Sequence, residues 1–122
     1  MRRESTTQER MNIYADAVAI VESDFASDLA LDDVARRIAS SRRQVQRVFA
    51  EIGGTTFRAY LTEVRMRRAA ELLGTSGLTV REVADSVGYR QSAQFAKAFR
   101  RIQSVAPSEY RHGAGREHAM AA

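Results

Sequence analysis

Two clusters of Arg, Lys, Gln and Ala residues lie some 50 residues apart in this chain of 122 residues. The first cluster consists of Arg42, Arg43, Gln46 and Arg47, and the second of Gln91, Ala93, Gln94 and Lys97. An Arg guanidinium can donate two parallel hydrogen bonds to guanine O6 and N7, and a Gln amide pairs in the same way with adenine. An Ala methyl group can contact a thymine methyl group. These residue types therefore predict base recognition in the major groove of DNA.

Side chains suited to phosphate contacts flank both clusters. We predict phosphate contacts from Ser41, Ser92, Arg100 and Arg101. Such contacts fix the position and orientation of a protein on the duplex but carry no sequence information. Of the 19 basic residues, only Lys97 is not Arg, which favours planar, two-pronged contacts to phosphate and guanine. Codon usage in a GC-rich genome explains the same bias equally well.

A duplication places both clusters in the same kind of element. Residues 31–60 and 78–110 superimpose at an offset of 49 in their first halves and of 50 in their second halves, which pairs Phe49 with Phe99. One turn is therefore a residue longer in the second copy. Each copy reads as a short helix, a tight turn and a second helix with basic residues, which is the pattern of a helix-turn-helix motif.

The hydrophobic periodicity of the chain is helical and shows no strand alternation, so it predicts an all-α fold of about seven helices. Two helix-turn-helix subdomains are expected, joined by a long linker helix. The expected divisions are a flexible N-terminal arm over 1–12, the first subdomain over 13–56, the linker helix over 57–74, the second subdomain over 75–111 and a flexible tail over 112–122.

The second helix of each motif is expected at 42–52 and 91–103. Its inward face is expected to hold Val45, Val48, Phe49 and Ile52 in the first copy, and Phe95, Ala98, Phe99 and Ile102 in the second. Four aromatic residues are expected in the core rather than in stacks on bases. They are Phe49, Tyr60, Phe99 and Tyr110.

Composition excludes several classes of function. The chain has no Cys, so disulfides, thiolate metal sites and cysteine nucleophiles are ruled out. The 2 His residues lack a partner at ligand spacing and the acidic residues read as helix-terminal and surface charges, so we expect no metal, no cofactor and no catalysis. No apolar run approaches the ~20 residues needed to span a bilayer, so we expect a soluble, cytoplasmic protein without membrane contact.

Charge is distributed unevenly along the chain. The net charge is +4, but residues 1–41 hold five Arg against eight acidic residues, whereas residues 42–122 hold 14 basic residues against seven acidic ones. The positive charge therefore belongs mainly to the repeated region, where it is expected to attract DNA phosphates.

The motifs of both repeats resemble the DNA-binding domain of the AraC/XylS-type transcription regulators. In the first repeat the resemblance is carried by Ser41, Arg42, Arg43, Val45, Arg47 and Phe49, then by Gly54, Thr56, Phe57, Tyr60 and Leu61, then by Arg65, Ala69, Leu72 and Leu73. In the second it is carried by Val83, Ala84, Val87, Gly88 and Tyr89, then by Phe95, Lys97, Phe99, Arg100 and Arg101, then by Pro107, Tyr110 and Arg111. The resemblance covers residues 15–111, nearly the whole chain.

Two departures from the family pattern bear on stability and recognition. After the last helix of the second motif the family usually has Phe-Gly-x-Ser/Thr-Pro, whereas residues 103–107 of this chain are Gln-Ser-Val-Ala-Pro. A left-handed Ser104 and the missing Ser/Thr cap are each expected to cost about 1 kcal/mol. Lys97 stands where Arg is usual, which is expected to weaken a two-pronged base contact.

The resemblance implies a stand-alone, single-domain, sequence-specific DNA-binding transcription regulator. It implies that each second helix enters one of two successive major grooves of a promoter or operator, and that one chain binds double-stranded DNA as a monomer. Activation beside RNA polymerase, in a bacterial cytoplasm at the nucleoid, is implied in the same way. Without a ligand-binding domain in this sequence, control by abundance or by a protein partner is expected.

Two alternatives come from other classes of function. The same fold can serve as a protein-interaction module, or as a partner-dependent co-regulator without independent DNA specificity. An alkyl-transfer DNA-repair protein, a class in which related domains occur, is excluded because that reaction requires a Cys. A steep fall of affinity with salt, together with preference for one DNA sequence, distinguishes the regulator from the interaction module.

Overall fold

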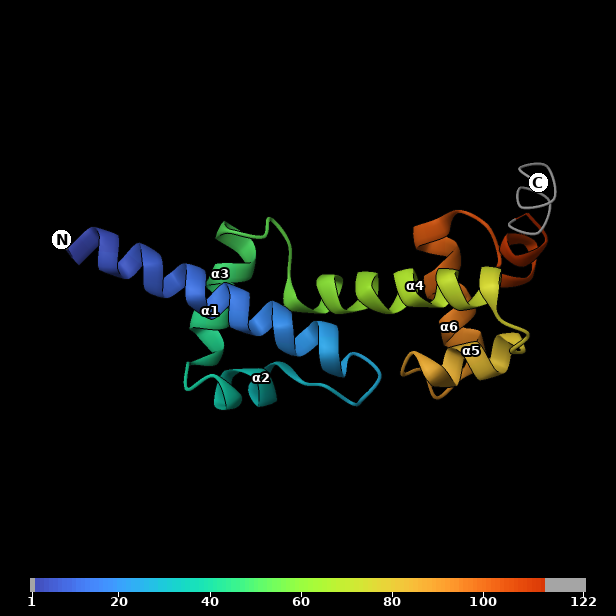
Figure 1. Ribbon diagram of the computed structural model, residues 1–122, viewed down its shortest axis with the longest axis horizontal. Coiled ribbons are helices and arrows are strands. Elements are labelled where there is room, and N and C mark those ends of the chain that lie inside the picture. The colour runs from blue at the N-terminus through green and yellow to red at the C-terminus, as the bar shows by residue number, and fades with distance from the viewer. Residues whose placement is uncertain (1, 114–122) are drawn as a thin grey trace. The chain divides into compact units, whose positions relative to one another are not determined.

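The structure, a computed structural model, describes residues 2–113 of the chain, with side chains from Thr6 onward. All regular structure in that part of the chain is helical (Figure 1). The helices are α1 (Arg2–Asp24), α2 (Leu31–Arg37), α3 (Arg42–Glu51), α4 (Phe57–Thr75), α5 (Val80–Ser86) and α6 (Ser92–Gln103), and a further, unlabelled helix covers 107–113. The expected all-α fold of about seven helices is confirmed.

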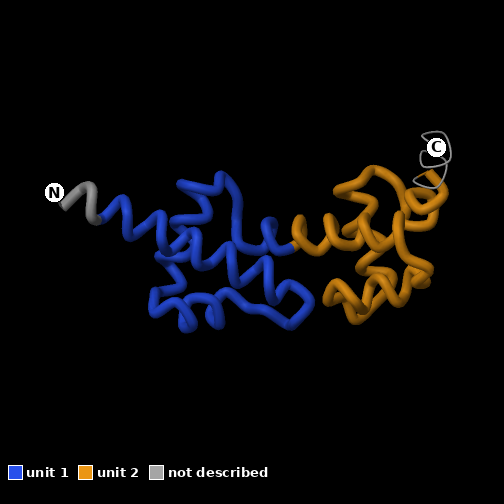
Figure 2. The backbone as a smooth tube through the Cα atoms, in the orientation of Figure 1, with its two compact units in different colours: residues 1–61 blue, residues 62–122 orange. Residues whose placement is uncertain are grey.

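The chain divides into two compact units, residues 1–61 and residues 62–122 (Figure 2). The boundary lies within α4, the helix that we expected as a linker over 57–74. α4 contributes buried residues to both units, because Phe57 and Leu61 precede the boundary whereas Met66 and Leu73 follow it. Each helix-turn-helix motif therefore has its own core.

The core of unit 1 is an aromatic cluster around Phe49 of α3, which is completely buried. The ring of Tyr14 from α1 meets it edge-on at a centroid distance of 5.5 Å, and Phe57 from α4 does so at 6.0 Å. Tyr60 lies at 5.8 Å from the ring of Phe49, and its hydroxyl donates a hydrogen bond of 2.7 Å to Glu22 of α1. The cluster thereby holds α1 and α4 against the inner face of α3.

Unit 2 repeats this design around Phe99 of α6. The ring of Phe95 lies at 5.7 Å from that of Phe99, and Tyr110 of the last described helix meets Phe99 edge-on at 5.4 Å. Tyr89, just before α6, meets Phe95 at 5.7 Å. Phe99 and Tyr110 correspond in the repeat to Phe49 and Tyr60 of unit 1. The duplicated sequence therefore forms a duplicated core. Of the four aromatic residues expected in the core, Phe49 and Phe99 are buried, and Tyr60 and Tyr110 are half-buried with their rings against them.

Among the described residues, each unit has two left-handed backbone positions, and they lie at equivalent points of the repeat. In the turn of the motif they are Ala39 (φ 54°) in unit 1 and Gly88 (φ 96°) in unit 2. After the second helix they are Gly54 (φ 63°) and Ser104 (φ 69°), which confirms the left-handed conformation expected of Ser104. Each unit therefore has one Gly and one residue with a Cβ, for which this conformation is strained.

The first helix begins earlier than we expected. In place of a flexible arm over 1–12, the structure has α1 from Arg2 onward. This segment lacks an apolar stripe, but Arg, Glu, Gln and Met favour helix. At the other end of the chain, His112 and Gly113, which we expected in a flexible tail, are helical, and the remainder of that expected tail, 114–122, lies outside the described residues.

Two residues that we expected on inward faces are exposed. Ile52 is 41% exposed and Ile102 is 40% exposed. Both lie at the C-terminal ends of their helices, one turn or less beyond Phe49 or Phe99. The apolar pattern of each helix therefore extends beyond the surface against which the helix packs. The other inward positions are buried or half-buried, and they are Val45, Val48, Phe49, Phe95, Ala98 and Phe99.

Candidate nucleic-acid interface

The start of α3 is fixed by Ser41. Its backbone is extended (φ −94°, ψ 153°), and its hydroxyl oxygen accepts a hydrogen bond of 3.0 Å from the Gln44 amide. This bond satisfies one of the amides that a helix N-terminus leaves unpaired. The side chain is exposed and keeps its own proton to donate, which is compatible with the predicted phosphate contact.

The outer face of α3 carries the first cluster of base-contact candidates. The buried face consists of Val45, Val48 and Phe49, which fixes the rotation of the helix. All four candidates on this helix are exposed, namely Arg42, Arg43, Gln46 and Arg47. They lie together on the exposed face of one helix, which is compatible with base readout, and the contacts themselves stay predictions.

Two of these Arg residues have weak acidic partners. Arg42 lies 3.8 Å from a carboxylate oxygen of Asp32, and Arg47 Nε lies 3.8 Å from Oε1 of Glu51. Both distances exceed hydrogen-bond range, and exposed pairs of this kind contribute about 1 kcal/mol or less. Arg43 forms no ion pair within the described residues. All three guanidinium groups can therefore turn to a DNA ligand at low cost.

The second cluster is carried by α6 and its N-cap. Gln91 has extended backbone angles (φ −121°, ψ 123°) and makes no side-chain cap, so its exposed amide is not used by the helix. Phe95 and Phe99 form the buried face. The predicted contact residues of this helix are all exposed, namely Gln91, Ser92, Ala93, Gln94, Lys97, Arg100 and Arg101.

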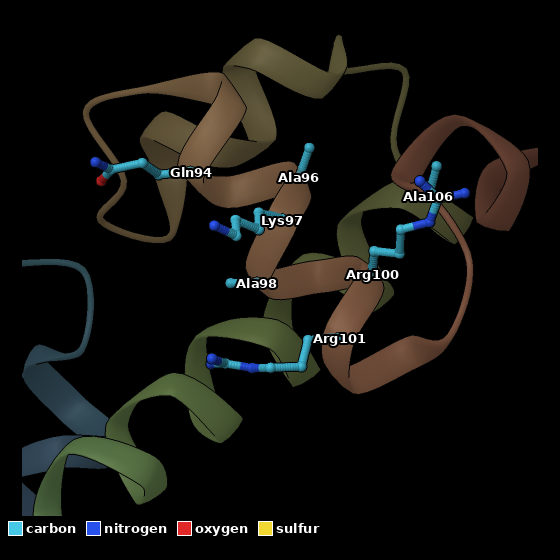
Figure 3. Close-up of a pocket in the computed structure, with 7 residues that line it drawn as sticks. All are labelled: Gln94, Ala96, Lys97, Ala98, Arg100, Arg101 and Ala106. Carbon is cyan, nitrogen blue, oxygen red and sulfur yellow. The ribbon is translucent and has the colours of Figure 1, made fainter.

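Figure 3 shows how the polar residues of α6 divide between two sides of the helix. Gln94, Lys97 and Arg101 point to the same side, as their spacing of three and four residues requires, whereas Arg100 points to the other side. Together with Ala96, Ala98 and Ala106 these residues line an open hollow on the surface. One side of α6 therefore presents an amide, an ammonium and a guanidinium group.

The charge of the two helices is strongly positive. α3 carries three Arg and one acidic residue, Glu51, whereas α6 carries Lys97 and two Arg with no acidic residue. In the repeat alignment Glu51 matches Arg101, so α3 has a carboxylate at the position where α6 has a guanidinium group. The two groups of candidates lie in different compact units, each presented by its own helix.

Sequence reasoning missed one contact to this surface. Arg10 of α1 forms an ion pair with Glu51 at the end of α3, and we had placed Arg10 in a flexible arm. Apolar periodicity gives no signal there, whereas helix propensity does. Along α4, Arg68 pairs with Glu71 of the next turn at 2.9 Å, and Arg65 lies over the ring of Tyr89 at 5.6 Å.

Residues 2–113 hold no helix that is long and apolar enough to cross a bilayer. Within the same residues no group of three or more His, Cys, Asp or Glu is placed to hold a metal ion.

The geometry of both units agrees with known proteins. A family described as a helix-turn-helix domain matches residues 34–113. The transcriptional activator AarP of Providencia stuartii is 30% identical over 105 residues, which are 86% of this chain and 78% of that protein. The C-terminal domain of AraT, a response regulator from Geobacillus stearothermophilus, superimposes with a TM-score of 0.81 at 33% identity, covering 83% of this chain and 84% of that one.

A solved structure with DNA is also similar. The DNA-binding domain of the global transcriptional factor AdpA, crystallised in complex with a target DNA, superimposes with a TM-score of 0.77 at 30% identity over 82% of this chain and 90% of that one. The chain spans only 33%, 13% and 28% of the length of three other curated relatives that it matches.

Proposed function

The chain belongs to the AraC/XylS-type helix-turn-helix family of DNA-binding transcription regulators, and from this premise we propose that it binds one asymmetric DNA site through α3 and α6. We propose further that one chain occupies the site, that each helix enters its own major groove, and that the bound protein activates transcription in contact with RNA polymerase at the bacterial nucleoid. The activator role is supported by AarP, which is described as a transcriptional activator. No catalytic step and no cofactor belong to this function.

The observation that carries the proposal is the repetition of one design in two units. In each unit a buried aromatic cluster fixes one face of a helix, and the opposite face presents amide and cationic side chains to solvent. A single basic helix is common on protein surfaces and indicates little. Two such helices that share a motif and both expose Gln and cationic groups are what two-site DNA reading requires.

The residues have distinct proposed roles. Arg43 and Arg47 donate to guanine, and Gln46 pairs with adenine. Gln94 and Lys97 are the principal readers on α6. The remaining base-contact candidates are Arg42, Gln91 and Ala93, and phosphates are held by Ser41, Ser92, Arg100 and Arg101.

The test is an in vitro selection from random duplex DNA with the purified chain, followed by sequencing. We expect an asymmetric motif of two unlike elements about one helical turn (~34 Å) apart. Enrichment of a single short DNA element would show that α6 contacts only phosphates, which contradicts base recognition at two sites. Recovery of no preferred sequence would contradict the regulator and favour the protein-interaction module.

A further inference from the structure

Glu51 is an unexpected residue at the end of a DNA-reading helix. It is the last residue of α3, where a carboxylate faces the negative end of the helix dipole. Its side chain is 49% exposed and follows Arg47 by one turn, so its charge opposes any approaching phosphate. The repeat places a cation, Arg101, at the same position of α6. A cation that neutralises this carboxylate would therefore reduce its repulsion of DNA phosphates.

Two guanidinium groups compete for Glu51. Arg10 Nη2 from α1 pairs with Oε2, whereas Arg47 Nε lies 3.8 Å from Oε1. The Arg10 side chain is the more enclosed of the two Arg side chains, at 32% exposed against 57% for Arg47. Because Arg10 occupies one oxygen and neutralises the carboxylate, the pull of Glu51 on Arg47 is reduced.

The position of Arg10 is held by the packing of α1 on the end of α3. Four residues after Arg10, Tyr14 packs edge-on against Phe49. Gly53, just after α3, lies so close to Tyr14 that a Cβ there would come within 2.8 Å of its hydroxyl oxygen. The Nε atom of Arg10 is buried without a hydrogen-bond partner among the described residues, so Glu51 is the contact that compensates this side chain.

We propose that Arg10 is a positioning residue for DNA recognition, which engages Glu51 and thereby leaves Arg47 available to read a base. This role rests on the proposed function. Arg10 lies on a helix that carries none of the predicted DNA contacts and acts through the carboxylate between it and the reading residue. The segment of α1 that precedes the helix-turn-helix motif is then part of the recognition apparatus.

The test measures binding of the full chain to the selected DNA site and to random DNA by fluorescence anisotropy. Arg10→Gln is expected to weaken binding to the selected site by roughly two- to fivefold, and to relax preference at the same base pair that Arg47→Ala relaxes. Arg10→Lys is expected to keep most of the affinity because it keeps the charge. Arg36→Gln, which removes an equally charged exposed residue of α2, is the matched control.

The deciding variant is Arg10→Gln combined with Glu51→Gln, which is expected to return affinity to within about twofold of the unaltered chain, because no carboxylate remains to attract Arg47. In an Arg47→Ala background, Arg10→Gln is expected to have no further effect. Loss that persists after Glu51→Gln, or equal loss on random DNA, would overturn the positioning role.

Glu51→Gln alone keeps the proposal testable if Arg10→Gln does not fold. It is expected to bind the selected site at least as tightly as the unaltered chain, and weaker binding would contradict the proposal. The two proposals fail separately: an unaltered chain without preferred DNA contradicts the function, whereas specific binding that is insensitive to Arg10→Gln contradicts only the role of Arg10.

Discussion

Arg47 and Arg101 lie at different points of their helices and are expected to differ in what they recognise. Arg47→Ala should cost about 1 to 3 kcal/mol on the selected site and much less on random DNA, because a two-pronged contact to guanine is lost. Arg101→Ala should weaken binding to both DNAs alike, because a phosphate contact is indifferent to sequence. Competition titrations with selected and scrambled duplexes measure the difference. Equal losses on both DNAs for Arg47→Ala would remove it from the reading residues.

Ser104 carries backbone strain that its repeat counterpart avoids. Its φ of 69° matches the 63° of Gly54, where a Cβ would meet no atom within 4 Å. Ser104→Gly is therefore expected to raise the free energy of unfolding by roughly 0.5 to 1 kcal/mol, net of the entropy that Gly loses on folding. Urea denaturation measures this change. Ser104→Ala keeps the Cβ and serves as the control, and a gain of the same size in that variant would show that the strain is not the cause.

The helices that the sequence predicted well are those with a buried apolar stripe and a turn residue at their ends. The apolar spacing of Val45, Val48 and Phe49, with Ser41 before it, located α3 to within a residue at its C-terminal end. The same reasoning failed for the N-terminal half of α1, where helix comes from propensity and from contacts such as that of Arg10 with Glu51. Such contacts join residues far apart in sequence, so no local pattern reveals them.

The candidate site was predictable to the same extent as its helices. Exposure of the predicted contact residues follows from burial of the opposite helix face, and both were inferred from one periodicity. The exposure of Ile52 and Ile102 could not be inferred from the sequence, because apolar periodicity does not show where the packing partner of a helix ends. The ion pair of Glu51 with Arg10 of α1 likewise could be found only from the tertiary structure.

Arg111 joins the end of α4 to the segment before α5. Its Nε donates a hydrogen bond of 3.1 Å to the carbonyl oxygen of Leu73, and Nη2 donates to that of Leu78. The first of these carbonyls belongs to the last turn of α4, where helical partners are absent. Arg111→Ala is expected to lower the free energy of unfolding by about 2 kcal/mol, because both bonds are partly buried. Chemical denaturation followed by circular dichroism tests this.

A suitable control for that measurement is Arg90→Ala, since Arg90 is exposed in the same unit. A loss of equal size in the control would mean that removal of positive charge, rather than of the carbonyl contacts, destabilises the protein.

The ends of α1 and α2 are joined by an ion pair that depends on pH. Arg37 donates a hydrogen bond of 2.5 Å to Asp24, and Ser23 donates another of 3.1 Å. The bond from Arg37, followed by that from Ser23, holds the pKa of Asp24 below its ordinary value. Because the folded pKa is lower than the unfolded one, this contribution to stability is complete above the ordinary aspartate pKa and is lost as pH falls through the folded value.

Asp24→Asn is therefore expected to lower stability at neutral pH and to flatten its decline in acid. Thermal unfolding between neutral pH and about pH 3 measures both effects. Asp28→Asn, at an exposed position in the following loop, provides the comparison. An unchanged acid profile in Asp24→Asn would assign the acid sensitivity to other carboxylates.

The whole chain combines an acidic first part with a basic repeated region. This asymmetry is expected to affect the salt dependence of DNA binding. Only five of the 19 basic residues precede Arg42, while α3 and α6 together carry Arg42, Arg43, Arg47, Lys97, Arg100 and Arg101. Counterion release depends on the cations that meet phosphates, and distant charges add little at physiological salt. We therefore expect the salt dependence of binding to follow the cations of α3 and α6 rather than the net charge of +4.

The salt dependence can be separated from net charge with two double variants that remove the same charge. Arg100→Ala with Arg101→Ala should reduce the slope of log affinity against log salt by about 2, because each lost phosphate contact removes about 0.9. Arg36→Ala with Arg90→Ala removes two exposed cations outside α3 and α6 and should leave the slope nearly unchanged. Titrations at four salt concentrations measure it. Equal slopes in both variants would mean that DNA is attracted by overall charge alone, which a protein-interaction module with a basic surface also produces.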